Sequence, residues 1–266
     1  MAHAVCQEAR SCTIGSPLPN RGSLVIARNI DHAPRLHPDP FPSTIPVVFA
    51  ATRLRQLLEP FGLELTSAQT DQTLAYLELL LRWNQKINLT AIRNPDECVT
   101  RHFGESLFVS NHFRLEGHLL DIGSGAGFPG LALKIAFPKL SVTLLEPVAK
   151  KRAFLKEAAR VCGFGQVEVR ADRLEDLARQ TPPPLFDFAT MRAVGNLGTM
   201  VPLAANCLKP GGNLLLWLTR DQASELPSIE ADLKWRDPLP VPLSHSGEIW
   251  SATKPERNSQ LRPSDG

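Results

Sequence analysis

From about residue 118 onward, short apolar segments alternate with stretches of helical periodicity, and no other feature restricts the fold as strongly. We expect strands at His118–Asp121, Val142–Glu146, Val167–Arg170, Phe186–Met191 and Asn213–Leu218. Helical patterns lie between them, at about 128–137, 148–162, 174–180 and 196–208. Strands that alternate with helices in this way form a parallel sheet covered by helices on both faces. We therefore predict an α/β fold.

The last part of the chain breaks this alternation. Two apolar segments, LPVPL (239–243) and EIWSAT (248–253), are separated only by a short polar stretch that contains His-Ser-Gly. Parallel strands need a long crossover connection, whereas antiparallel strands can be joined by a tight turn. The parallel sheet should therefore finish in an antiparallel hairpin.

A helical segment precedes the first strand. Leucines recur at helical spacing before Gly62, and Thr66 with Gln69 fits a capping box at the start of a long second helix. Asn94 and Pro95 have the residue types of an N-cap and a first helical position. We expect a third helix from Pro95 to about Asn111.

These patterns divide the chain into four parts. Residues 1–46 contain seven prolines and no sustained periodicity, so we expect a disordered extension. Residues 47–114 should form a helical, RNA-binding region, residues 115–255 the α/β domain, and residues 256–266 a disordered tail.

Composition excludes several classes of protein. The five cysteines are scattered and form no Cys/His cluster, so we expect neither a metal site nor a disulfide framework. No apolar run reaches the roughly 18 residues of a membrane span. We expect a soluble, cytoplasmic monomer. The net charge of +2 neither requires nor excludes a nucleic-acid partner, so local patches must decide that question.

The sequence LLDIGSGAGFPGL (119–131) places an acid and several glycines at the end of the first expected strand, where a doubly wound sheet binds its ligand. Asp121 is followed by Gly123, Gly125 and Gly127, whereas a dinucleotide fingerprint reads GxGxxG. A carboxylate beside a pyrophosphate is unfavourable. S-adenosylmethionine instead carries an ammonium and a sulfonium group, which an acid suits. The loop therefore indicates S-adenosylmethionine as the cofactor.

Two further strand ends carry acids. Glu146 ends the second strand and could accept hydrogen bonds from both ribose hydroxyls, although an acid that caps the next helix is the alternative. After the third strand, ADRLED offers Asp172, Leu174 and Glu175 around the adenine. Acids are frequent in surface turns, so that third position is less specific than the first two.

The fourth strand end bears on the methyl acceptor. It reads MRAVG (191–195), without the Asn/Asp-Pro-Pro-aromatic motif that positions an exocyclic amine, and no cysteine is placed for attack on a pyrimidine. An acceptor that is already nucleophilic is favoured, such as guanine N7. Arg192 could then contact the cofactor carboxylate or guide the guanine, whose O6 and N7 are acceptors. A salt bridge at the strand end is the alternative.

A polar and basic cluster at 83–106 indicates RNA. Its candidate RNA-binding residues are Asn84, Lys86, Asn88, Arg93, Arg101, His102 and Ser106. Cations suit backbone phosphates, and an aromatic ring suits an unstacked base. Trp83 is nevertheless better explained as a core residue. The basic run AKKRAFLK (149–156) fits a solvated helix face nearly as well as an RNA contact.

Together these motifs resemble the ribosomal RNA small subunit methyltransferase G family, also called glucose-inhibited division protein B, over about residues 52–255. The resemblance is carried by WNxxxNLTxxRxxxExxxRHxxES (83–106), DIGSGAGFPG (121–130), LLEPxxKKxxFL (144–155) and Arg-Ala at 192–193. It implies a class I S-adenosylmethionine-dependent methyltransferase fold, which is Rossmann-like and has a C-terminal antiparallel hairpin. It also implies methyl transfer to N7 of one guanine in 16S rRNA, with the small ribosomal subunit as partner.

The resemblance also implies site residues, and the chain departs from the family at the end of the fifth strand and in a final strand that is more polar than usual. The implied cofactor positions are Gly123, Phe128, Leu174, Glu175 and Arg192, with Asp121 and Glu146 in support. Phe128 replaces a residue that is often leucine. The family's usual lysine-glycine pair after the fifth strand is absent, which leaves Arg220 as a stand-in.

Other activities remain open from the sequence. The alternative activity is a class I methyltransferase that acts on another RNA or on a small molecule. A small-molecule substrate is disfavoured, because no acid cluster resembles a metal site and the helical segment before the first strand is basic. A third possibility is a non-catalytic protein that kept the fold and binds RNA or a nucleotide.

Overall fold

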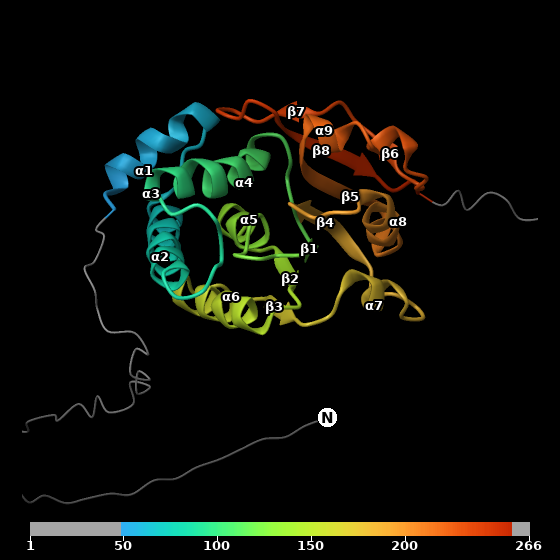
Figure 1. The fold of residues 1–266 in the computed structure, drawn as a ribbon, viewed down its shortest axis with the longest axis horizontal. Helices are drawn as coiled ribbons and strands as arrows, with labels where there is room; N and C mark the ends of the chain where they lie inside the picture. Colours follow the sequence, from blue (N-terminus) through green and yellow to red (C-terminus); the bar gives the residue numbers. More distant parts are fainter. Residues whose placement is uncertain (1–48, 257–266) are drawn as a thin grey trace, which may run out of the picture. The chain divides into compact units, whose positions relative to one another are not determined.

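The computed structural model describes residues 49–256 of the 266-residue chain (Figure 1). The predicted disordered extension and, apart from Glu256, the predicted disordered tail lie outside the described residues. All described residues fall in one compact unit. Among them, no helix is both long enough and apolar enough to cross a membrane.

The centre of the fold is a mostly parallel sheet in the strand order β3-β2-β1-β4-β5-β8-β6, with β7 paired to β8. Its parallel strands are β1 (His118–Ile122), β2 (Ser141–Leu145), β3 (Val167–Arg170), β4 (Phe186–Arg192) and β5 (Leu208–Thr219). β8 (Gly247–Thr253) runs antiparallel to β5, and also to β6 (Lys234–Trp235) and β7 (Leu239–Pro240). This arrangement confirms the predicted α/β fold and the antiparallel strands at its end.

Helices cover both faces of the sheet, as the alternation predicts. α5 (Gly130–Ala136) and α6 (Ala149–Val161) pack on one face, and α7 (Leu174–Ala178) and α8 (Leu197–Asn206) on the other. Short α9 (Arg220–Ala223) and η4 (Leu226–Ser228) follow β5. Successive residues of a strand point to opposite faces, so Leu215 and Trp217 of β5 enter one core while Leu214, Leu216 and Leu218 enter the other.

The helices before β1 add a further layer on the α5–α6 face. They are α1 (Ala51–Leu58), η1 (Glu59–Phe61) and α2 (Ser67–Asn84), and α2 packs against both α5 and α6 (Figure 1). The predicted capping box at Thr66 and Gln69 is present. The same hydrophobic core runs from these helices into the sheet. The predicted boundary between residues 114 and 115 stays a prediction.

The expected third helix spans its predicted range but is not a regular α-helix. It consists of α3 (Pro95–Glu97), a π-helical segment η2 (Cys98–Gly104), α4 (Glu105–Leu107) and the 3₁₀ turn η3 (Phe108–Asn111). The side chain of Asn94 caps its start, as predicted. π-helical turns are rare and are frequently found at functional sites, and η2 carries Arg101 and His102.

Candidate functional site

The glycine loop after β1 adopts a conformation that only glycines accept readily. Gly123, Gly125 and Gly127 have φ values of +71°, +55° and +86°, in the left-handed region. Tyr76 of α2 holds the loop from below, because its hydroxyl donates a hydrogen bond to the carbonyl oxygen of Ala126 at 2.5 Å. A Cβ at Gly127 would lie 2.1 Å from that hydroxyl oxygen. The loop is therefore fitted against the helical layer.

Glu146 lies just beyond β2 and faces the same loop. Its Oε2 accepts a hydrogen bond from the Gly125 amide at 2.9 Å, and its Oε1 accepts one from the Val148 amide at 2.8 Å. The residue is only 3% exposed. The second bond orders the turn before α6 without capping the helix, since the N-cap of α6 is Val148 and α6 has no side-chain cap bond. The first bond ties the acid to the glycine loop. Each carboxylate oxygen keeps a further lone pair for a ligand.

Asp121 is also buried, beside β4 and the start of α5. Its Oδ1 accepts a hydrogen bond from the Thr190 hydroxyl at 2.7 Å. Its Oδ2 lies against the start of α5, where a Cβ at Gly130 would come within 2.7 Å of it. Burial raises the pKa of Asp121 to about 6, although the hydrogen bond from Thr190 lowers it, and Oδ2 has no hydrogen-bond partner among the described residues. In this structure Asp121 joins β1, β4 and α5.

The raised pKa of Asp121 has a predictable effect on stability. The folded-state pKa exceeds the unfolded value of about 3.9, so the folded protein holds the proton longer and ionisation destabilises it. This penalty is absent below about pH 4 and nearly complete at pH 7. Between pH 5 and 7, the wild-type protein should lose about 1 kcal/mol of unfolding free energy relative to Asp121→Asn. Urea unfolding of both proteins checks this, and parallel pH profiles would contradict it.

The predicted adenine-binding turn lies at the start of α7. Leu174 is buried in the core on the α7–α8 face, so only its main chain can face a ligand. Glu175 is partly exposed in the first turn of the helix. Asp172 Oδ2 accepts a hydrogen bond from Arg170 Nε at 2.9 Å. Asp172 and Glu175 therefore both keep a partly exposed carboxylate for a ligand, whereas the Leu174 side chain does not face solvent.

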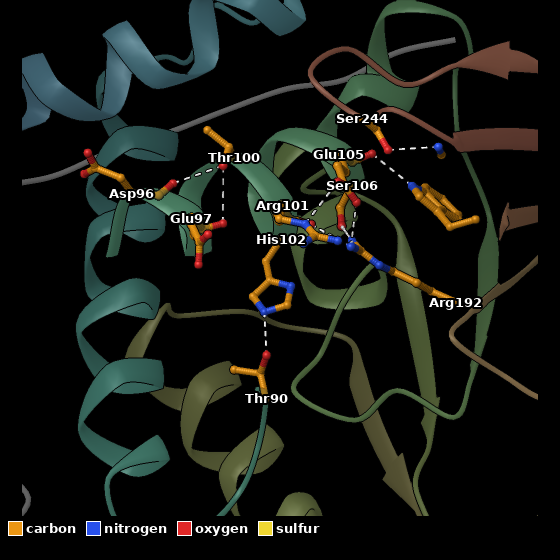
Figure 2. Close-up of polar contacts among 12 residues, drawn as sticks. Thr90, Asp96, Glu97, Thr100, Arg101, His102, Glu105, Ser106, Arg192 and Ser244 are labelled. Carbon is orange, nitrogen blue, oxygen red and sulfur yellow. Dashed lines mark hydrogen bonds and ion pairs between the residues drawn. The ribbon is translucent and has the colours of Figure 1, made fainter. Parts of the chain in front are cut away.

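Arg192, at the end of β4, is held by the segment that precedes β1. Its Nη2 donates hydrogen bonds to Glu105 Oε2 and to the Arg101 carbonyl oxygen, both at 2.6 Å, while Nη1 is 3.4 Å from the Ser106 hydroxyl (Figure 2). The side chains of Arg192 and Glu105 are 16% and 14% exposed. The salt bridge that we gave as the alternative role is therefore present.

Glu105 is the centre of this network, and sequence reasoning missed it. Burial raises the pKa of its carboxyl, while Arg192 and Arg101 lower it. Its carbonyl oxygen accepts a hydrogen bond from the Trp217 indole at 2.9 Å, which connects the network to the end of β5. Arg101 lies 3.8 Å from the other carboxylate oxygen and remains exposed. Two cations thus share one acid at the edge of the site.

His102 and Phe128 connect the π-helical segment η2 to the glycine loop. The His102 ring stacks on Phe128 with 4.7 Å between centroids, and Tyr76 stacks on the other side at 5.2 Å. The pKa of His102 falls to about 3, chiefly because the ring is buried and also because Arg192 and Arg101 are near. The imidazole is therefore neutral at physiological pH.

The predicted RNA-binding residues fall into two groups. Lys86, Asn88, Arg93 and Arg101 are exposed, whereas Asn84 and Ser106 are 4% and 0% exposed. The Asn84 amide bonds to the main chain of three residues, Leu89, Thr90 and Ile92. This corrects our expectation for two positions, because Asn84 orders the loop after α2 and Ser106 faces Arg192. Trp83 packs edge-on against Phe154 in the core, as expected.

Comparison with known proteins decides which family this geometry belongs to. A family model described as rRNA small subunit methyltransferase G matches residues 69–242. A protein of that name from Stenotrophomonas maltophilia (strain K279a) is 40% identical over 203 residues, which cover 74% of this chain and 91% of the relative. Another, from Syntrophotalea carbinolica, is 36% identical over 193 residues, 73% and 89% of the two chains.

The chain belongs to the rRNA small subunit methyltransferase G family. It is therefore an S-adenosylmethionine-dependent methyltransferase. Among solved structures, the ribosomal protein L11 methylase from Lactobacillus delbrueckii subsp. bulgaricus superimposes with a TM-score of 0.50 at 14% identity. That superposition covers 59% of this chain and 79% of the other, and it supports the class I methyltransferase fold alone.

The loop geometry of this family member fits its cofactor. The left-handed glycines leave a cradle without side chains, and at Gly123 a Cβ would come 3.2 Å from Val194. Glu146 supplies negative charge and open lone pairs beside that cradle. Both observations suit a ligand that carries hydroxyls and positive groups.

In this rRNA small subunit methyltransferase G family member, the structure locates Arg220, the residue proposed to replace the family's lysine after β5. Arg220 starts α9 directly beyond β5, and its Nε donates to Glu248 at 3.2 Å while the side chain stays 68% exposed. It lies at the same edge of the sheet as the site but is engaged by an acid of β8. The role of lysine stand-in stays a prediction.

Proposed function

We propose that the chain transfers a methyl group from S-adenosylmethionine to N7 of one specific guanine in the 16S rRNA of the small ribosomal subunit. The observation that carries the proposal is the contact of residues 83–106 with the cofactor loop. The exposed Arg101 lies on η2 with His102, which stacks on Phe128, and the exposed Lys86 and Arg93 lie in the loop that leads into α3. A polyanionic acceptor bound there lies beside the glycine loop. The cytoplasmic location and the monomeric state stay predictions.

We infer that the glycine loop and two acids hold the cofactor. Gly123, Gly125 and Gly127 let the main chain approach it, and Glu146 accepts hydrogen bonds from its hydroxyls. Phe128 supplies an apolar wall, and Glu175 lies at the turn assigned to the adenine. Asp121 acts from behind the loop through β4 and α5.

Methyl transfer to guanine N7 requires little from the protein except that it positions the two reactants. S-adenosylmethionine, when bound, supplies a methyl group whose bond to sulfur breaks as the guanine N7 lone pair forms the new bond. N7 has no proton to lose, so no general base is required. The residues must orient the base and exclude competing water. Arg192, fixed in place by Glu105, and the exposed Arg101 are the cations positioned for guanine O6 or a neighbouring phosphate.

Replacement of Glu146 with alanine should weaken cofactor binding. The change removes an acceptor for the ribose and also releases the Gly125 amide, which holds the loop. Hydrogen bonds to a charged group contribute about 1.5–3 kcal/mol, so the dissociation constant should rise roughly ten- to hundredfold. Titration calorimetry with S-adenosylmethionine measures the change. Glu168→Ala, at an exposed acid on β3, is the control, and an affinity for Glu146→Ala equal to that control would remove the proposed role.

The activity itself is tested with labelled S-adenosylmethionine and three substrates: naked 16S rRNA, mature small subunits and small-subunit assembly intermediates. The expected product is a single N7-methylguanine, which is located by chemical cleavage at the modified base. Label on another RNA or on a small molecule would replace the proposed substrate. Cofactor binding without transfer to any acceptor would favour a non-catalytic binding protein.

A further inference from the structure

The loop between α2 and α3 is joined to the glycine loop after β1 through one hydrogen bond and one ring stack. This substrate loop, residues 85–94, carries the exposed Lys86, Asn88 and Arg93. Thr90 lies within it, and its hydroxyl oxygen is 2.9 Å from His102 Nε2 (Figure 2). His102 in turn stacks on Phe128, the residue that follows Gly127.

Thr90 is the residue that fixes the imidazole. Thr90 Oγ1 accepts a hydrogen bond from the Ile92 amide at 3.1 Å, so its own proton is available for His102 Nε2. The other ring nitrogen, Nδ1, is buried and has no hydrogen-bond partner among the described residues. Apart from stacking, the orientation of the ring therefore depends on one hydroxyl in the substrate loop.

Tyr76 of α2 extends the contact between His102 and Phe128 to the glycine loop. Tyr76 stacks on the opposite face of Phe128, with only 3° between the ring planes, and its hydroxyl binds the Ala126 carbonyl oxygen. Phe128 is thus held between a ring oriented by the substrate loop and a ring that supports the cofactor loop. Because His102 stays neutral at physiological pH, its proton state does not disturb this column.

The substrate loop contains no helix or strand between α2 and α3, and side-chain contacts hold it instead. The Asn84 amide supplies three of its hydrogen bonds, and Leu89 is buried in the core. A ligand that further restricts the motion of such a segment makes the next binding event less costly in entropy. RNA on the cations of this loop would therefore also fix Thr90.

Building on the proposed function, we propose that Thr90 and His102 are positioning residues that couple the two substrates. RNA bound to the substrate loop holds the Thr90–His102–Phe128 column in place, which orders the glycine loop and tightens cofactor binding. Coupling is reciprocal, so bound cofactor tightens RNA binding by the same factor.

The test measures binding of S-adenosylhomocysteine, which allows no turnover, to the full chain with and without a 16S rRNA fragment that contains the mapped guanine. In the wild type, saturating RNA should tighten binding by about fivefold or more, the lower range of allosteric coupling. Thr90→Val and His102→Phe should each reduce that factor to about one, because each removes the same hydrogen bond from a different side. Thr90→Ser should restore it.

Thr100→Val is the matched control. The Thr100 hydroxyl bonds to the main-chain carbonyl oxygens of Asp96 and Glu97 and not to the ring column, so the full coupling factor should remain. Wild-type coupling in both Thr90→Val and His102→Phe would overturn the proposal, as would the absence of coupling in a wild-type protein that binds both ligands. If the wild type does not bind the fragment, the same measurement is made with mature small subunits and with assembly intermediates. A protein that binds S-adenosylhomocysteine but none of these substrates would instead contradict the proposed function.

Discussion

Arg192→Ala is expected to lower methyl transfer by about a hundredfold, the scale on which loss of a positioning contact acts. It should also lower the free energy of unfolding, because Glu105 would keep its buried charge without its 2.6 Å partner. Removal of one partner of a buried pair costs about 3–5 kcal/mol, and this pair is partly exposed, so we expect about 2–3 kcal/mol. Steady-state kinetics and urea unfolding measure the two effects.

The second substitution Glu105→Gln separates these effects. In the double variant no buried charge is left unpaired, since Arg101 is exposed to solvent, so most of the stability should return while activity stays low. The loss of stability in Arg192→Ala should also be smaller at pH 5 than at pH 7, since burial already raises the pKa of Glu105 and a protonated acid needs no cation. Recovery of full activity in the double variant would restrict Arg192 to a structural role.

Gly127→Ala should abolish measurable cofactor binding and destabilise the fold by about 2–4 kcal/mol, since both overpacking and backbone strain act there. The added carbon would lie 2.1 Å from the Tyr76 hydroxyl oxygen and 2.9 Å from Leu131, at a φ of +86°. Tyr76 cannot retreat easily, because it is fully buried between Phe103 and Phe128. Calorimetry with S-adenosylmethionine and thermal unfolding check both effects.

Gly125→Ala is the matched comparison in the same loop. It also has a positive φ, +55°, but the nearest atom to an added Cβ is a carbonyl oxygen at 3.7 Å. It should therefore show only backbone strain, about 1 kcal/mol. If the two variants lose the same free energy of unfolding, backbone strain alone explains the loss, and the close contact between Gly127 and Tyr76 does not contribute.

The architecture could be predicted because its signals are local and repeated. Each parallel strand is a short apolar run between turns, and strand alternation with helices leaves few arrangements. β5 begins at Leu208, where Leu208 pairs with Phe186, and not at the predicted Asn213. The prediction began too late because the sequence LKPGG (208–212) is typical of a turn. The two-residue strand β6 has no pattern long enough to read.

The site was only partly predictable, because its geometry depends on contacts between distant residues. The spacing of glycines and acids indicated which strand ends hold the cofactor. Nothing near Tyr76 in the sequence indicates that its hydroxyl would reach a loop 50 residues away. The π-helical segment η2 was equally hidden, since it differs from an α-helix by a small change in hydrogen bonding that leaves the apolar pattern intact.

Asn84 and Ser106 show a related limit. Both are polar and belong to the segment that resembles an RNA-binding motif, yet both are buried and bond to their own protein. A motif identifies residues that a family needs, but it does not separate those that touch a ligand from those that hold the motif together. That separation required the side-chain contacts.

The chain contains a single tyrosine, and it is Tyr76, stacked beneath the glycine loop. Biosynthetic replacement of tyrosine by 3-fluorotyrosine would therefore give one ¹⁹F resonance, without assignment work and without a substitution elsewhere. Its chemical shift would respond to the position of Phe128 and to the state of the Ala126 carbonyl. The protein thus carries a single-site reporter for occupancy of its glycine loop.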